Sequence, residues 1–261
     1  MEDIDMELRT LGDTGIEVSR LCFGTGTQGW SGASDQTRLG LQELADLMHY
    51  AFDRGITFFD VADQYGSHEH IARMLKAVDR DDVVLTTKTC AKTAAEAEAD
   101  IERFQKELGT EVLDIVLMHC MTSADWTDAR SGVLEVLEQK KQEGVILAHG
   151  VSCHDFGAFC TAAETDWVDV VLARINYAGK HMDGPPEKII PVIDKMHDAG
   201  MGVYGMKVVG AGELGDDARD AIHYVLDLPS IDAITIGMIN RQQVDDNIGH
   251  VGVHRLEPQP G

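Results

Sequence analysis

The chain has 261 residues, of which 44% are hydrophobic, 26% charged and 6% aromatic. This composition is typical of a folded globular protein and excludes collagen-like, coiled-coil and disordered chains. Lysine and arginine number 22 against 45 aspartates and glutamates, so the net charge is −23 with histidine neutral. Such an acidic surface repels phosphate backbones and anionic lipid, and we therefore expect no nucleic-acid partner and no membrane partner.

The cysteines and the first residues bear on the compartment. Five cysteines, an odd number without a C-x-x-C pair, argue against a disulfide framework or a zinc ribbon. The opening sequence MEDIDMELRT is acidic and polar, unlike a secretory leader. No apolar run approaches the roughly 18 residues of a membrane-spanning helix. We therefore expect a cytoplasmic protein.

Short, β-branched apolar runs recur along the chain after a first hairpin at residues 8–18, which contains a Gly-Asp-Thr-Gly turn. Because the runs are continuously apolar, they predict a parallel sheet that is buried on both faces. The expected strands are residues 20–23, 56–59, 83–87, 113–118, 145–151, 168–173, 203–206 and 233–236.

Amphipathic helical patterns separate these strands. Residues 41–52, 96–108, 132–142 and 188–197 carry apolar side chains at helical spacing, and Gly55, Gly109, Gly144 and Gly200 follow them as helix stops. Eight strand–helix units without a linker favour a closed barrel over an open sheet. The sequence therefore predicts an α/β fold, a (β/α)8 TIM barrel with an N-terminal β-hairpin, as one domain over residues 1–261.

Polar side chains follow four successive strands. Asp60, Lys88, His119 and Ser152 come after the second to fifth strands, at separations of 28, 31 and 33 residues. The carboxyl ends of barrel strands converge on the mouth where barrel enzymes place their chemistry. We therefore expect these side chains to face one another.

Tyr65, five residues beyond Asp60, is a candidate general acid. A free phenol has a pKa near 10, but a neighbouring ammonium such as that of Lys88 would lower this pKa, and Asp60 would keep the lysine charged. With His119 orienting a carbonyl oxygen, these four side chains would protonate the oxygen of an aldehyde or ketone as hydride reaches its carbon.

Towards the end of the chain, GAGEL and GMINRQQ provide glycine turns for phosphate, with Asn240 as the N-cap of a helix that starts at Arg241.

The motifs LGDTGIEVSRLCFGTG, GITFFDVADQYG, LTTKT, LDIVLMHC, GVSCH and IGMINRQQVDDN, in this order, resemble the aldo-keto reductases from about Leu11 to Asn247. The resemblance implies a (β/α)8 barrel that binds NADPH, less often NADH, without metal. It makes Tyr65 the acid/base, gives Asp60 and Lys88 the task of tuning it, and has His119 orient the substrate carbonyl. The implied activity is the interconversion of an aldehyde or ketone, including a sugar, with its alcohol.

The resemblance also implies a cofactor site. Five positions depart from the family pattern: Cys153 replaces an Asn, Arg174 replaces a carboxamide-binding Gln, Met206 replaces an aromatic, and Gly237 and Gln243 replace a Lys and an Arg that clamp the 2′-phosphate. Arg241 and Lys207 are the cations that would compensate, so NADPH is favoured and NADH is possible. The expected cofactor-binding residues are Gly24, Thr25, Gly26, Asp60, Ser152, Arg174, Met206, Lys207, Gly210, Gly212, Gly237, Met238, Asn240, Arg241, Gln243, Asp246 and Asn247.

Several interpretations stay open. Trp30 and Trp126, in loops expected to rim the mouth, either line a substrate pocket beside Tyr65 and His119 or merely cover loops. His68-Glu-His70 is interpreted as a solvated helix start rather than a metal site. The short C-terminus predicts an open substrate site or one completed by a partner subunit, so we expect a monomer or a homo-oligomer.

Two rival functions compete with the reductase. One is a nucleotide-binding regulatory or redox-sensor subunit with little turnover. The other is an unrelated phosphosugar lyase or isomerase barrel that forms a Schiff base at Lys88.

Overall fold

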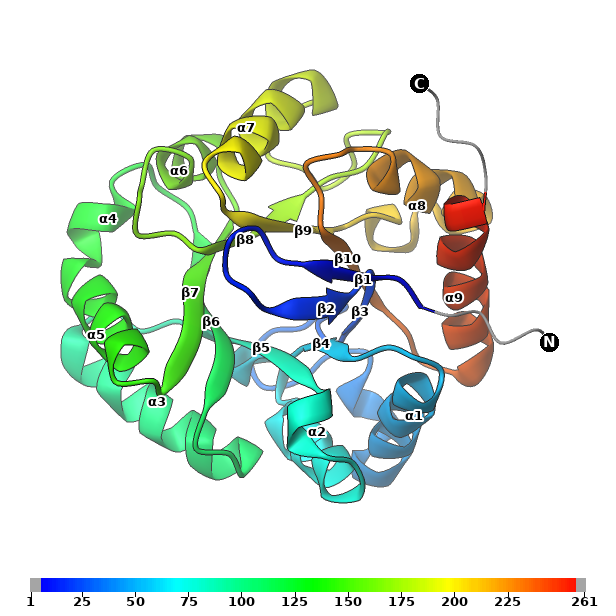
Figure 1. Ribbon diagram of the computed structural model, residues 1–261, viewed down its shortest axis with the longest axis horizontal. Helices are drawn as coiled ribbons and strands as arrows, with labels where there is room; N and C mark the ends of the chain where they lie inside the picture. Colours follow the sequence, from blue (N-terminus) through cyan, green and yellow to red (C-terminus); the bar gives the residue numbers. More distant parts are fainter. Residues whose placement is uncertain (1–5, 257–261) are drawn as a thin grey trace.

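The computed structural model describes residues 6–256, and within them eight parallel strands form a closed barrel surrounded by helices (Figure 1). The α/β TIM-barrel prediction is confirmed, with each expected strand present and its ends shifted by a few residues at most. The barrel strands are β3 (Leu21–Gly24), β4 (Phe58–Asp60), β5 (Val84–Thr89), β6 (Leu113–Met121), β7 (Ile146–Cys153), β8 (Val170–Arg174), β9 (Gly202–Met206) and β10 (Ala233–Gly237). Parallel pairing of β10 with β3 closes the ring.

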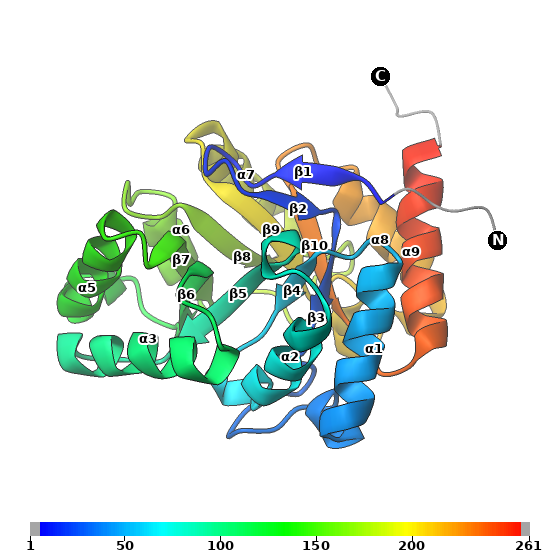
Figure 2. The ribbon, with the colours of Figure 1, turned by 60° about the horizontal axis from the view of Figure 1, so that its bottom comes forward.

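The predicted N-terminal hairpin is also confirmed. Strands β1 (Leu8–Thr10) and β2 (Glu17–Ser19) pair antiparallel and lie across one end of the barrel (Figures 1 and 2). Leu11 and Val18 are fully buried and pack with residues of the barrel interior. Gly12 has φ +47, and a Cβ there would lie 2.4 Å from the Gly200 carbonyl oxygen, so this turn needs glycine. The hairpin therefore plugs the amino-terminal end of the barrel.

Helices cover the outside of the barrel and enclose the main apolar core. Helix α3 begins with a capping box between Thr93 and Glu96 and ends at Gly109, which has φ +69. Asn240 Oδ1 accepts a hydrogen bond from the Gln243 N–H at 2.9 Å, which confirms the predicted cap of α9. The helices are α1 (Leu41–Asp53), α2 (His68–Met74), α3 (Ala94–Leu108), α4 (Trp126–Ala129), α5 (Ser131–Gln142), α6 (Phe156–Ala162), α7 (Pro186–Asp198), α8 (Ala218–Leu226) and α9 (Arg241–Leu256).

Large apolar side chains fill the interior of the barrel. Phe58, Leu117 and Leu172 pack there with Tyr204, so the barrel is a packed core and not a pore. Chemistry is thereby confined to the carboxyl ends of the strands. Among the described residues, no helix is both long enough and apolar enough to cross a membrane.

Candidate active site

A pocket of about 760 Å³ opens at the carboxyl end of the barrel. Its wall includes residues of β3, β4, β6, β7, β8, β9 and β10, of helices α8 and α9, and of the loops between these elements. The expected site residues that line it are Gly24, Gly26, Trp30, Asp60, Tyr65, His119, Ser152, Met206, Lys207, Gly212, Gly237, Gln243, Asp246 and Asn247. This volume suits a ligand of cofactor size rather than a small carbonyl compound alone.

Four ionisable side chains meet at the pocket wall. The Tyr65 hydroxyl lies 3.2 Å from His119 Nε2, and Lys88 Nζ lies 4.9 Å from the centroid of the Tyr65 ring. Lys88 is fully buried, forms an ion pair with Asp60 and donates a hydrogen bond to the Val61 carbonyl at 3.1 Å. A proton donor, a hydrogen-bonding imidazole and a buried ion pair therefore share one site, as the strand spacing predicts.

Tight packing holds the tyrosine in place. Tyr65 ends a 3-10 turn, η2 (Asp63–Tyr65), and Gly66 follows with φ +65. A Cβ at Gly26 would lie 2.5 Å from the Tyr65 ring, and a Cβ at Gly29 would lie 2.7 Å from it. Only glycine at these two positions leaves room for the ring.

The pKa of the tyrosine departs from the sequence prediction. Burial, followed by the negative charge of Asp60, raises the pKa of Tyr65 well above its ordinary value. The predicted lowering of this pKa by Lys88 is wrong, because burial of the hydroxyl is the largest cause and it favours the protonated phenol. Burial, with the positive charges of Lys88 and His154, lowers the pKa of His119 to about 2. The site thus presents a protonated phenol beside a neutral imidazole.

Sequence reasoning missed a hydrogen-bond partner of Asp60. Tyr204, on β9, is fully buried in the barrel, and its hydroxyl donates a hydrogen bond to Asp60 Oδ2 at 2.8 Å. Lys88 Nζ donates a hydrogen bond to the other carboxylate oxygen of Asp60, Oδ1. The only signal in the sequence is a tyrosine inside an apolar strand, which does not reveal the partner.

The two residues expected to bind the nicotinamide carboxamide, Ser152 and Arg174, have different surroundings. Ser152 Oγ lines the pocket and accepts a hydrogen bond from the Cys120 N–H at 2.9 Å. Arg174 does not line the pocket, because its guanidinium forms an ion pair with Asp183 at 3.1 Å and contacts His154. The structure therefore does not support the expected cofactor contact of Arg174.

The expected phosphate end offers an open backbone and one cation. Gly212 has φ +100, and the space that its Cβ would fill is open. Lys207 is half-buried, and its side chain has no hydrogen bond or ion pair with any described residue. An exposed glycine backbone and an ammonium without a partner among the described residues both line the pocket, and they fit a phosphate group.

Arg241 is not where the prediction put it. Its guanidinium lies 4.7 Å from the centroid of the Tyr50 ring, and the residue does not line the pocket. This stacking on α1 draws the arginine away from the predicted 2′-phosphate position. Four other expected residues also lie outside the pocket lining: Thr25, Gly210, Met238 and Asn240.

The two tryptophans have different places. Trp30 is 52% exposed, lines the pocket, and its ring centroid lies 5.6 Å from that of His119. Trp126 is only 2% exposed, and its indole N–H donates to the Ala158 carbonyl at 3.2 Å. The prediction that Trp126 rims the mouth is wrong, since it packs beneath the helices against Trp167.

The His68-Glu-His70 motif is also misread from sequence. Both histidines are buried, with 5% exposure each, so they are not part of a solvated helix start. His68 Nδ1 lies 2.6 Å from Glu107 Oε2, and its Nε2 lies 2.8 Å from Thr87 Oγ1. The helix buries this face against β5 and α3, which a local pattern does not record.

The fold and the site define a TIM-barrel protein with a tyrosine, histidine and buried lysine–carboxylate pair at its mouth. Comparison with families of known proteins matches residues 20–223 to the aldo/keto reductase family. This match covers more than half of the chain, so the chain belongs to the aldo/keto reductase family and is an oxidoreductase of that type.

Individual relatives are similar at moderate identity. Aldo-keto reductase YhdN of Bacillus subtilis (strain 168) is 31% identical over 167 residues, which are 56% of this chain and 47% of that protein. The chain therefore spans about half the length of that relative. L-galactose dehydrogenase of Arabidopsis thaliana is 23% identical over an alignment of 291 residues, covering 94% of this chain and 88% of that protein.

Solved structures agree with the fold. A structure from Pseudomonas aeruginosa, assigned to the aldo-keto reductases, has a TM-score of 0.80 and 26% identity, over 97% of this chain and 98% of that one. Aldo-keto reductase AKR11C1 from Bacillus halodurans, in its holo form, has a TM-score of 0.74 over 98% of this chain and 97% of that one. Because the two sequences are only 20% identical, this similarity is evidence for a shared fold and not for a shared activity.

Proposed function

We propose that this protein interconverts an aldehyde or ketone with its alcohol, using NAD(P)H and Tyr65 as general acid and base. The observation that carries the proposal is the Tyr65 hydroxyl, 3.2 Å from His119 Nε2 and next to the buried Lys88–Asp60 pair, in one pocket. The similarity to L-galactose dehydrogenase supports including a sugar among the substrates to be tested.

The pocket residues fit a nicotinamide dinucleotide. Lys207 and the open backbone at Gly212 would hold the diphosphate, Ser152 and Met206 would hold the nicotinamide, and Asn247 would face the adenine. The bound cofactor supplies the hydride. The protein holds the carbonyl oxygen with the neutral His119 imidazole and delivers the Tyr65 proton to that oxygen.

The raised pKa of Tyr65 predicts opposite pH dependence for the two directions. Reduction needs the protonated phenol and should stay nearly constant from about pH 6 to about pH 9, whereas oxidation needs the phenolate and should rise up to about tenfold per pH unit. His119, with a pKa of about 2, stays neutral throughout this range. Steady-state kcat/KM in both directions checks this. A fall in reduction between about pH 7 and about pH 9 would show that Tyr65 ionises there.

We infer that this protein prefers NADH over NADPH, the opposite of the preference expected from the sequence. Lys207 is the only lysine or arginine among the described residues that line the pocket, and the Asp246 carboxylate lines it on α9. Arg241, the other expected cation, is stacked on Tyr50. A 2′-phosphate would thus meet a carboxylate without a cation beside it.

Adding a cation should change this preference. We expect Gln243→Arg to raise NADPH affinity about tenfold relative to NADH, because a guanidinium at this pocket-lining position pairs with the 2′-phosphate. Fluorescence titrations with each cofactor measure the ratio. Gln42→Arg is the control: this glutamine hydrogen-bonds Asp46 at 2.6 Å on α1, neither residue lines the pocket, and the substitution should leave the ratio within twofold. Equal shifts in both variants would argue against a phosphate contact at residue 243.

The test of the function is loss of nicotinamide absorbance with an activated aromatic aldehyde, with NADH and NADPH in separate assays. The reverse assay uses NAD with an aldose such as L-galactose. Turnover in either direction supports the proposal. Tight cofactor binding without turnover on any carbonyl or alcohol would favour the regulatory subunit instead.

A further inference from the structure

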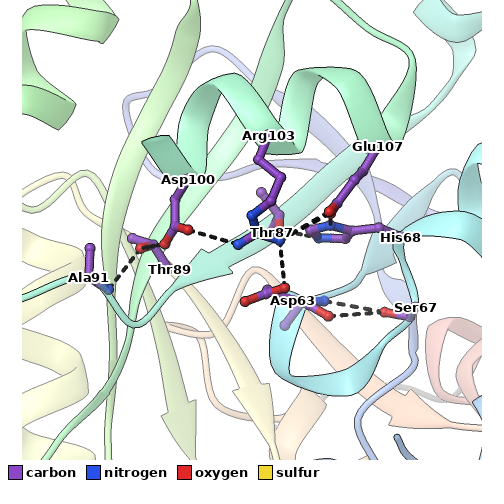
Figure 3. A network of polar contacts seen from close by, with 10 residues as sticks. Asp63, Ser67, His68, Thr87, Thr89, Ala91, Asp100, Arg103 and Glu107 are labelled. Atoms are coloured by element: carbon purple, nitrogen blue, oxygen red, sulfur yellow. Dashed lines mark hydrogen bonds and ion pairs between the residues drawn. The ribbon is translucent and has the colours of Figure 1, made fainter. Parts of the chain in front are cut away.

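A network of charged side chains outside the pocket contacts the turn that ends with Tyr65 (Figure 3). Arg103, on α3, lies at its centre. Its Nη2 donates to Asp100 Oδ1 at 2.7 Å, and its Nη1 donates to Asp63 Oδ1 at 2.7 Å and to Glu107 Oε1 at 3.1 Å. Asp63 is the first residue of η2, the short turn that Tyr65 ends.

The same network reaches β5 by two routes (Figure 3). Thr89 Oγ1 donates to Asp100 Oδ2 at 2.6 Å. His68 bridges Thr87 Oγ1, at 2.8 Å, and Glu107 Oε2, at 2.6 Å. Both routes end on a carboxylate that Arg103 holds.

These two threonines flank Lys88 in the strand. Because successive side chains of a strand point to opposite faces, Thr87 and Thr89 face the helices while Lys88 faces the barrel interior. The Arg103 guanidinium is therefore connected to the turn that ends with Tyr65 and, through the two carboxylates on α3, to both strand neighbours of Lys88. A guanidinium carries five N–H donors in a rigid planar fork, so it can hold three carboxylates in fixed directions at once.

We propose that Arg103 is a positioning residue that sets the place of the Tyr65 hydroxyl relative to Lys88 and His119. It acts through Asp63 and does not touch the reacting atoms. This inference rests on the proposed function, in which Tyr65 transfers the proton.

The test compares Arg103→Met with Arg80→Met in the full chain. Arg80 is the matched control, because it pairs with Asp114 at 2.5 Å and contacts the Val83 carbonyl at the other end of β5. In Arg103→Met we expect kcat to fall about 10- to 100-fold, with the NADH Kd and the number of binding sites unchanged. The solvent deuterium isotope effect on kcat should rise, because a displaced phenol slows proton transfer. Partial unfolding alone would lower kcat without changing this isotope effect.

A milder variant and a second measurement cover the remaining outcomes. Arg103→Lys keeps the charge without the fork and should restore only part of kcat. Hydrogen exchange of residues 61–67, followed by mass spectrometry, should quicken in both Arg103 variants and stay unchanged in Arg80→Met, whether or not the protein turns over a carbonyl. If residues 61–67 exchange equally in all variants, Arg103 does not position Tyr65. An absence of turnover in the wild type would count against the proposed function alone.

Discussion

Tyr65→Phe should lower kcat for carbonyl reduction about 10²- to 10⁴-fold, the range that a positioned general acid contributes. The substitution removes only the hydroxyl that lies 3.2 Å from His119 Nε2, and the ring keeps its packing against Gly26 and Gly29. The measurement is the initial rate of NADH loss with an activated aldehyde, together with an NADH titration. We expect cofactor affinity to change less than threefold.

Tyr50→Phe is the matched control for this prediction. This substitution also removes one hydroxyl group, which hydrogen-bonds Asp245 at 2.8 Å on the outside of the barrel. Tyr50 does not line the pocket. Its kcat should stay within twofold of the wild type. If Tyr65→Phe kept more than a tenth of the wild-type rate, another group would have to supply the proton.

Lys88→Met should cost about 3–5 kcal/mol of unfolding free energy, in addition to activity, because it breaks a buried ion pair. Lys88 is fully buried and Asp60 is 3% exposed, so the remaining carboxylate cannot regain its hydration. Only the Tyr204 hydroxyl, 2.8 Å away, would still donate to the Asp60 carboxylate among the described side chains. Urea unfolding at neutral pH measures the loss.

Two further variants distinguish the cost of an unpaired buried charge from a nonspecific loss of stability. Asp60→Asn combined with Lys88→Met removes both charges and should recover part of the stability while staying inactive. Lys141→Met breaks a half-exposed pair with Asp169 and should cost less than about 1 kcal/mol. A loss as small in Lys88→Met as in Lys141→Met would mean that water reaches Asp60 when the lysine is removed.

The position of the Tyr65 side chain could be predicted from the sequence, whereas that of the Arg241 side chain could not. Tyr65 follows Asp60 by five residues, and strand ends of a parallel barrel all point to one mouth, so its place follows from local order. Arg241 starts a helix as predicted, but its side chain lies over Tyr50, a residue of another helix. A flexible side chain takes the neighbour that packing offers, and the sequence does not name that neighbour.

By itself the sequence determined the barrel, the hairpin, the order of the strands and the meeting of Asp60, Tyr65, Lys88 and His119, because hydrophobic periodicity and strand ends are local properties. The tertiary structure alone decided contacts such as Tyr204 with Asp60, which join residues 144 positions apart. It also decided the direction of the Tyr65 pKa shift. That shift depends on how much water the fold excludes from the hydroxyl, and desolvation is set by the whole assembled barrel rather than by neighbouring residues in the chain.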